Sequence, residues 1–507
     1  MAQTGNHTAF GRRGIAHIGH RMSIDRSRVG VVDVGSNSVR LVVFDGISRS
    51  PAYFYNEKVL CGLGAGLAES GCLNPEGRVR ALGALRRFAA LMKGFGAGAL
   101  TGVATAAVRE ASDGPEFVSE VLQETGIELQ VISGVEEAAF SAKGVLLGWP
   151  KANGLVCDIG GASMELARLQ DGVIGACGTS PLGPLKLQDY DGNVDAQIAR
   201  EVRSLLNEVG SKAGHLFLVG GSWRAVARLD MSRRGYPFKV LHEYRLSAAQ
   251  IRETVDWIAA QSAEELEART NTSKERLALV PMAARVMTGL LKALEPEEVI
   301  ISSYGLREGM LHEQMPLSTR GLDPLTEACR QMEATSARFP GFGQVLFEWL
   351  RPLYPDVAAE RRRLILAACL LHDTSWQAHP DYRAIMCFEA VTRANLGGVD
   401  HAGRMFLGLA ILSRYKNSGV TSLGEGMMAL LTDDEINDAV SLGKAMRLGA
   451  MVSGAQADLL DKATLARTSD SLELTLEGPA LALNGEVVEK RLESLARAMR
   501  LEARLRY

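Results

Sequence analysis

Two stretches of the chain show short apolar runs interrupted by a tight polar break, which is the pattern of a β-hairpin. The first runs from Arg28 to Gly46 and is rich in valine on both sides of its break. The second runs from Gly154 to Gly172 and has the same form. Each predicts two strands joined by a tight turn.

The two predicted hairpins share a motif. Aspartate, glycine and serine recur with the same offsets, so that both copies read Asp, apolar, Gly, two residues, Ser. One copy is weak, because Asp and Gly are common in turns and the Asp and Ser side chains can cap their own turn. Two matching copies indicate a duplicated unit that faces a shared cleft. The paired positions are Asp33 with Asp158, Gly35 with Gly160, and Ser38 with Ser163.

The chemistry of this motif favours phosphate. Glycine lets the backbone approach an oxyanion closely, turn amides donate to it, and serine adds a hydroxyl donor. The strand-end aspartates, Asp33 and Asp158, would repel phosphate unless a divalent cation such as Mg²⁺ lay between them. We therefore expect these two aspartates to hold Mg²⁺. The expected phosphate-binding residues are Gly35, Ser36, Asn37, Ser38, Gly160, Gly161, Ala162 and Ser163.

A helix start separates two adjacent glutamates. Ser133 and Glu136 have the spacing of a capping box at the head of the helix EEAAFSAKGVLL. Glu136 thus has a structural task, whereas Glu137 has none. Two arginines are candidate phosphate ligands: Arg109, whose alternative is an ion pair with Glu110 or Asp113, and Arg40, which strand alternation places on the face of Ser38.

Beyond a linker at residues 313–325, helical periodicity extends to about residue 450. The last part has strand-like SLELTLEG and ALALNG, followed by an amphipathic helix expected from Glu486 to Arg504. A length of 507 residues suits about three domains.

Six motifs then occur in the order found in one enzyme family. They are VVDVGSNSVRLVV, ATAAVREASDG, ISGVEEAAFSAKGV, CDIGGASMEL, FLVGGSWRAVARL and ISSYGLREGML. The chain resembles exopolyphosphatases and guanosine pentaphosphate phosphatases, strongly from Arg28 to Leu311. The resemblance implies an α/β protein with two actin/ribonuclease-H-like lobes around a cleft. A mainly α-helical HD-like C-terminal region and a small terminal α+β part follow. The expected segments are a tail at 1–27, lobes at 28–134 and 135–314, a helical domain at 322–450 and the terminal part at 451–507.

The resemblance also implies chemistry, in which water attacks a terminal phosphorus. Glu137 is then the catalytic carboxylate, Glu165 a second carboxylate beside the phosphates, and Arg109 a phosphate ligand. In related ATPases the turn that contains Gly221 approaches adenosine, and we expect Gly221 among the phosphate-binding residues of this chain. Here Trp223 either obstructs a nucleotide base there or belongs to the core. His372-Asp373 resembles the centre of an HD metal site, but no histidine lies between the linker and this pair, so we expect a metal-free relic.

Three functions remain open: an exopolyphosphatase acting on inorganic polyphosphate, a phosphohydrolase of guanosine pentaphosphate (pppGpp), and an actin-fold kinase or ATP-driven switch. The long C-terminal region favours the first, because it is long enough to enclose a channel. Basic residues either line such a path or lie on solvated helix faces. They are Lys186, Arg224, Arg228, Arg361, Arg362 and Arg363.

Charge and composition narrow the partners. The formal net charge is −3, so a polyanion must be held by a local basic site, and we expect no nucleic-acid partner. The seven cysteines are scattered without a C-x-x-C pair, which indicates reduced thiols and a cytoplasmic protein. No apolar stretch approaches the roughly 20 residues of a membrane helix, so we expect no membrane partner. The family resemblance implies a homodimer.

Overall fold

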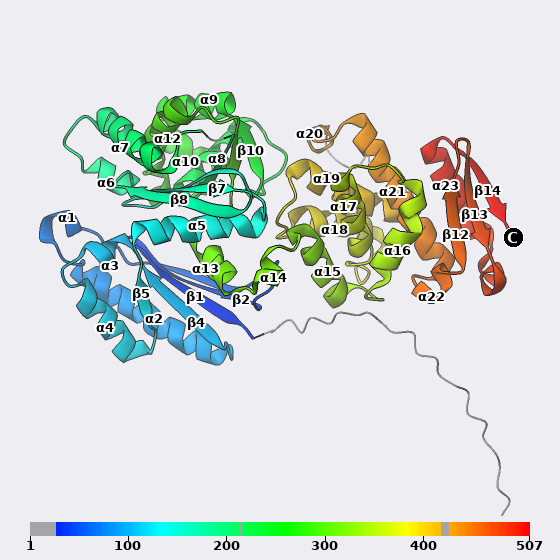
Figure 1. The fold of residues 1–507 in the computed structure, drawn as a ribbon, viewed down its shortest axis with the longest axis horizontal. Coiled ribbons are helices and arrows are strands. Elements are labelled where there is room, and N and C mark those ends of the chain that lie inside the picture. The colour runs from blue at the N-terminus through cyan, green and yellow to red at the C-terminus, as the bar shows by residue number, and fades with distance from the viewer. Residues whose placement is uncertain (1–26, 213, 417–424) are drawn as a thin grey trace, which may run out of the picture.

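The computed structural model describes residues 27–212, 214–416 and 425–507. The expected N-terminal tail therefore lies almost wholly outside the described residues. Figure 1 shows two α/β lobes stacked at one end of an elongated molecule, then a helical region, then a small sheet at the other end.

The first lobe is built on a five-stranded sheet of order β3-β2-β1-β4-β5. The first three strands form an antiparallel meander, and β4 and β5 run parallel to β1. Helices α2 and α4 bury Phe88 and Phe117 in a core shared with Val32 and Leu41 of the sheet. The elements are β1 (Val29–Val34), β2 (Ser38–Phe44), β3 (Tyr53–Leu60), α1 (Leu67–Ser70), α2 (Pro75–Gly94), β4 (Ala99–Ala104), α3 (Ala106–Glu110), α4 (Gly114–Thr125) and β5 (Leu129–Val131).

The second lobe repeats this plan with one added strand, in the order β10-β11-β9-β6-β7-β8. Strands β6, β7 and β8 form the antiparallel meander, β9 and β11 run parallel to β6, and β10 is an antiparallel edge. The elements are β6 (Gly154–Ile159), β7 (Met164–Gln170), β8 (Val173–Ser180), α6 (Pro184–Gln188), α7 (Val194–Val209), β9 (His215–Val219), α8 (Gly221–Arg233), β10 (Tyr244–Ser247), α9 (Ala248–Ala259), α10 (Ala263–Arg269), α11 (Lys274–Leu277), α12 (Val280–Leu294) and β11 (Glu298–Ile301).

Two helices cross between the lobes: α5 (Gly134–Gly148) and α13 (Leu306–Gln314). A Cβ on Gly309 would lie 1.7 Å from the carbonyl oxygen of Phe140, and one on Gly144 would lie 2.2 Å from that of Gly305. The helices can therefore approach this closely only with glycine at both positions. Helix α13 lies within the stretch expected to form the second lobe, yet its apolar side chains share a core with β1 of the first.

The helical region and the terminal sheet share one hydrophobic core. Strands β12 and β13 are antiparallel, and β14 runs parallel to β13. The elements are α14 (Leu317–Arg320), α15 (Pro324–Ser336), α16 (Phe342–Leu350), the 3₁₀ turn η1 (Arg351–Leu353), α17 (Ala359–Leu371), α18 (Pro380–Arg393), α19 (His401–Tyr415), α20 (Glu425–Met428), α21 (Asp433–Ser453), α22 (Ala457–Leu460), β12 (Ala463–Arg467), β13 (Ser471–Leu476), the 3₁₀ turn η3 (Gly478–Leu483), α23 (Glu486–Met499) and β14 (Glu502–Arg506).

Two predictions for this terminal part are wrong. The strand expected over ALALNG is the 3₁₀ turn η3. The last helix ends at Met499, because Arg500 adopts a left-handed conformation with φ of 58°, and the chain then continues as β14. The pattern changes there from helical spacing to the alternation of Leu501, Ala503 and Leu505, which fits a strand.

The His372-Asp373 pair lies at the end of α17. His372 Nδ1 is 2.8 Å from the Cys369 carbonyl oxygen. Both Asp373 oxygens accept from Arg338, at 2.7 and 2.8 Å, and Arg414 lies 3.6 Å away. Two guanidinium groups thus balance the charge of Asp373. The kinship of this region with HD domains stays a prediction.

One stretch, Lys274–Leu294, is long and apolar enough by composition to cross a membrane, which the sequence interpretation overlooked. Half of its apolar window is buried, and Val280, Met287 and Leu290 lie in the core of the second lobe. Core helices of globular proteins pass the same test, so this stretch is weak support for a membrane contact.

Candidate active site

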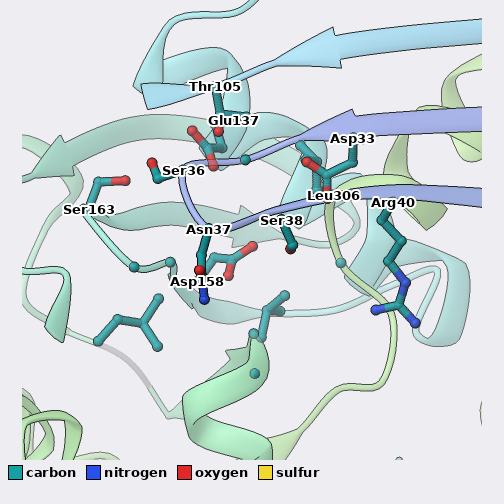
Figure 2. Close-up of a pocket in the computed structure, with 18 of the residues that line it drawn as sticks. Asp33, Ser36, Asn37, Ser38, Arg40, Thr105, Glu137, Asp158, Ser163 and Leu306 are labelled. Atoms are coloured by element: carbon teal, nitrogen blue, oxygen red, sulfur yellow. The ribbon is translucent and has the colours of Figure 1, made fainter. Parts of the chain in front are cut away.

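A hollow of about 210 Å³ opens between the two lobes, where both hairpin turns meet the starts of α8 and α13. We call it the central hollow (Figure 2). Thirteen of the fifteen residues expected at the site line it. They are Asp33, Gly35, Ser36, Asn37, Ser38, Arg40, Glu137, Asp158, Gly160, Gly161, Ala162, Ser163 and Gly221.

The two hairpin turns are structural copies of each other. The Gly35 amide donates to the Ser38 carbonyl at 3.0 Å, and the Gly160 amide donates to the Ser163 carbonyl at 3.0 Å. The duplication predicted from sequence is therefore confirmed in three dimensions. The strand residues opposite the two aspartates differ, however: Asp33 pairs with Arg40 across the first hairpin, and Asp158 with Glu165 across the second.

The turns offer free backbone donors. The Ser36 and Asn37 carbonyls accept from amides of the Cys61–Gly64 segment at 2.9 and 3.0 Å, which fixes the first turn. The amides of Ser36, Asn37, Gly161 and Ala162 have no acceptor among the residues that the structure describes. Amides of this kind at the lip of a polar hollow suit phosphate oxygens.

Three carboxylates reach the central hollow, and burial raises the pKa of each. Asp33 is 3.0 Å from Arg307, which partly offsets the effect of burial on its pKa. Asp158 accepts a hydrogen bond from the Ser141 hydroxyl. Burial, and then the neighbouring charge of Glu165, raise the pKa of Glu137 well above its ordinary value.

Glu165 and Arg109 do not line the central hollow but lie next to residues that do, Asp158 and Glu137 respectively. Glu165 is 1% exposed and accepts from the Thr179 hydroxyl at 3.0 Å. Burial, followed by the charge of Asp158, raises its pKa to about 8. The Arg109 guanidinium donates to the Ile132 carbonyl at 2.7 Å and lies 3.8 Å from a Glu137 oxygen. Arg109 therefore faces Glu137 and makes neither of the ion pairs considered as its alternative.

The capping box is confirmed. The Ser133 amide donates to a Glu136 oxygen at 2.7 Å, and the Glu136 amide donates to the Ser133 hydroxyl at 3.2 Å. Glu136 is thereby used at the start of α5, while the side chain of Glu137 is only 14% exposed and lies at the central hollow. That burial was not anticipated from the sequence.

Trp223 belongs to the core. It is 0% exposed and packs among the apolar residues of the second lobe, so it does not obstruct the central hollow. Arg276 occupies the neighbouring space instead: a Cβ on Gly221 would lie 2.9 Å from its Cζ atom.

Sequence reasoning missed most of the positive charge. Arg40 was anticipated, and Arg224 was placed only on a longer path, but the central hollow is also lined by Lys58, Arg276 and Arg307. Burial and the four arginines lower the pKa of Lys58, and burial lowers that of Arg224 to about 10. Lys58 lies directly opposite Arg40 across β2 and β3. Like charges in that register are unfavourable unless an anion lies between them.

Three of the other basic residues expected on a substrate path have structural partners. Arg361 is 3.2 Å from Glu435 and lies over the Phe406 ring, and Arg363 is 3.0 Å from Asp323. Lys186 is 3.6 Å from Glu110. None of them lines the central hollow, so its positive charge comes from the two lobes.

The donor set fits a hard divalent ion. Asp33 and Asp158 supply carboxylate oxygens to one hollow. Among the described residues there is no group of three or more His, Cys, Asp or Glu that could hold a metal alone. Two carboxylates, with water and substrate phosphate as the remaining ligands, are the usual arrangement for Mg²⁺.

The buried carboxyl pair predicts how stability depends on pH. The pKa of Glu165 rises from an ordinary 4.5 to about 8. Between those values the folded protein binds more protons than the unfolded chain. The contribution of Glu165 to the free energy of unfolding is full below pH 4.5 and is lost as the pH rises through about 8. In EDTA, we expect the Tm to fall across this range, with at most about 1.4 kcal/mol per pH unit for one proton.

Thermal unfolding of wild type and Glu165→Gln at several pH values tests this expectation. The variant should show a shallower fall of Tm with pH, because its amide does not titrate. Equal slopes in the two proteins would contradict the raised pKa of Glu165.

Residues 18–318 match the Ppx/GppA phosphatase family, and residues 328–505 match the family described as exopolyphosphatase, C-terminal. Among proteins of known function, Exopolyphosphatase 1 of Mycobacterium tuberculosis is 28% identical over 312 residues, which are 58% of this chain and 90% of that protein. Exopolyphosphatase 1 of Mycobacterium leprae is 28% identical over 313 residues, which are 58% of this chain and 91% of that protein.

Solved structures agree on the fold of the two lobes. An exopolyphosphatase from Cytophaga hutchinsonii gives a TM-score of 0.51 at 23% identity, covering 57% of this chain and 99% of that one. The Aquifex aeolicus member of the Ppx/GppA family gives 0.50 at 24% identity, covering 57% and 97%. The expected fold class, two actin-like lobes followed by a helical region, is confirmed.

Proposed function

Because this chain belongs to the Ppx/GppA phosphatase family, we propose that it is a Mg²⁺-dependent exopolyphosphatase. In this reaction it releases terminal orthophosphate from inorganic polyphosphate. The observation that carries the choice of substrate is the lining of the central hollow. It contains five cationic side chains and, among the described residues that line it, no aromatic ring. A chain of phosphates needs charge, whereas a nucleobase is usually held by stacking on a ring.

The residues divide the work as follows. The free amides and serine hydroxyls of the two turns hold the terminal phosphate, and Arg307 neutralises its charge from the start of α13. Glu137 accepts a proton from the attacking water. Arg109, 3.8 Å away, favours the ionised form of Glu137. Mg²⁺ held by Asp33 and Asp158 would supply charge stabilisation for the phosphate oxygens.

The remaining cationic side chains bind the part of the substrate that extends away from the reacting phosphate. Arg40 and Lys58 lie on the first lobe, and Arg224 and Arg276 on the second. Arg228 follows Arg224 by one helical turn on α8, and its charge contributes to lowering the pKa of Arg276. The repulsion among these cations is relieved when the second and later phosphates of a chain lie between the two lobes.

Hydrolysis of pppGpp is the second candidate, because the same chemistry acts on its terminal phosphate. A kinase or ATP-driven switch requires space for adenosine at the Gly220-Gly221 turn, where the guanidinium of Arg276 lies. We therefore place polyphosphate first, pppGpp second and ATP last.

Phosphate release from long-chain polyphosphate, pppGpp and ATP, each with Mg²⁺, tests this order. We expect the highest kcat/KM on polyphosphate and little release from ATP. Asp158→Asn, prepared identically, controls for contaminating phosphatases. A kcat/KM for pppGpp above that for polyphosphate would overturn the assignment in favour of the second candidate.

A further inference from the structure

Helix α5 carries two polar side chains on the face that points to the central hollow. Glu137 and Ser141 are four residues apart, so they lie one above the other on the same side of the helix. Ser141 is 0% exposed, and its hydroxyl donates to Oδ2 of Asp158 at the end of β6. Helix α5 thus carries the proposed catalytic carboxylate and also bonds to a proposed metal ligand.

A buried serine in the middle of this helix needs an explanation. Its neighbours on the helix, Ala138, Ala142 and Val145, are apolar and buried in the core of the second lobe. A hydroxyl there costs free energy unless it is hydrogen-bonded, and mid-helix serines commonly bond back to the carbonyl four residues earlier. The hydroxyl of Ser141 is instead directed to Asp158.

The helix that bears Ser141 is held at three points. The capping box fixes its first turn, and the Gly144 contact with Gly305 fixes its middle. At its last turn the buried Arg49 donates to the carbonyls of Leu147 and Leu146, the latter at 3.3 Å. A side chain on such a helix can hold its partner at a constant place.

The second oxygen of Asp158 lies close to the Gly220-Gly221 turn. A Cβ on Gly220 would lie 2.9 Å from Asp158 Oδ1, and Gly220 lines the central hollow. Oδ2 accepts from the Ser141 hydroxyl, whereas Oδ1 accepts no hydrogen bond from the described residues and is the oxygen more available to a cation. The carboxylate therefore has one fixed orientation.

We propose that Ser141 is a positioning residue that orients Asp158 toward Mg²⁺ through a single oxygen and fixes its place relative to Glu137. This inference rests on the proposed function, since it assigns Asp158 to the metal. Hydrogen bonds to metal-ligating carboxylates typically change metal affinity or activity by about 10- to 100-fold when removed.

The test is metal binding by the substrate-free protein. Mn²⁺ binding is followed by electron paramagnetic resonance, and Mg²⁺ binding by competition. We expect Ser141→Ala to weaken Mn²⁺ and Mg²⁺ binding about 10-fold or more, and Ser141→Thr, which keeps a hydroxyl, to restore much of it. In polyphosphate hydrolysis, Ser141→Ala should need more Mg²⁺ for half-maximal rate, while its KM for polyphosphate at saturating Mg²⁺ changes little.

A matched control is available in the helical region. Ser453 is 1% exposed and bonds to the Gly449 carbonyl of its own helix at 2.9 Å, so Ser453→Ala removes a comparable hydroxyl far from the hollow. Its metal affinity should equal that of wild type. Thermal unfolding of each variant is recorded. If Ser141→Ala does not fold, Ser141→Cys, which keeps the size of the side chain but donates weakly, should show the same loss of affinity.

The outcomes separate the two ideas. Wild-type metal affinity in Ser141→Ala or Ser141→Cys, with binding abolished in Asp158→Asn, would overturn the role of Ser141 and leave the proposed function standing. Unchanged binding in Asp158→Asn itself would remove the metal assignment on which both rest.

Discussion

Replacing Glu137 by glutamine is expected to lower kcat on polyphosphate by about 10² to 10⁴. Glutamine has almost the same shape but cannot accept a proton from the attacking water. The pKa of Glu137 is raised chiefly by burial, so the neutral amide removes a group whose ionisation is unfavourable in the folded protein. The Tm should therefore stay the same or rise slightly, and substrate binding should survive because one negative charge leaves an anion site.

The adjacent glutamate provides the matched control. Glu136→Gln should keep nearly full kcat, since glutamine also serves in a capping box with Ser133. Steady-state kinetics and thermal unfolding of the two variants decide the matter. An inactive Glu136→Gln beside a normal Glu137→Gln would reverse the assignment. Full rates in both would leave Glu165 as the carboxylate to test next.

Asp158→Asn is expected to reduce Mg²⁺-dependent activity by about 10² or more, because the amide keeps the shape of the side chain and loses its charge. Burial raises the pKa of Asp158, so the neutral variant should fold at least as well as wild type. The rate is measured over a range of Mg²⁺ concentrations, with the exposed Asp256→Asn as the control variant. Normal activity with the normal Mg²⁺ dependence in Asp158→Asn would refute the metal assignment.

The local features of the site could be predicted because they depend on short-range patterns. The turns of both hairpins follow from apolar runs broken by glycine and serine, and the capping box follows from the spacing of Ser133 and Glu136. The hydrogen bonds of these elements join residues only three apart. The residues that form such patterns lie within a few positions of each other in the sequence.

Long-range partners could not be predicted in the same way. Arg307 contacts Asp33 across 274 positions of sequence, and no periodicity indicates that meeting. The burial of Glu165 depends on how β7 lies between β6 and β8, and the pairing of Lys58 with Arg40 depends on the register of β3. The end of the last helix at Met499 was missed because the left-handed residue that follows it, Arg500, is an arginine rather than a glycine.

The residues opposite the two aspartates differ in charge, which makes the two hairpins electrostatically unequal. Opposite Asp33 stands Arg40, so the strand pair of the first hairpin carries balancing charges, whereas opposite Asp158 stands Glu165, so the second is acidic on both strands. A symmetric pair of turns would favour neither hairpin as the place of the reacting phosphate. With this asymmetry, the reacting end of the polymer belongs beside the acidic hairpin and the proposed cation, and the rest of the polymer belongs between the basic side chains of the two lobes. This arrangement suits an enzyme that acts at the end of a chain.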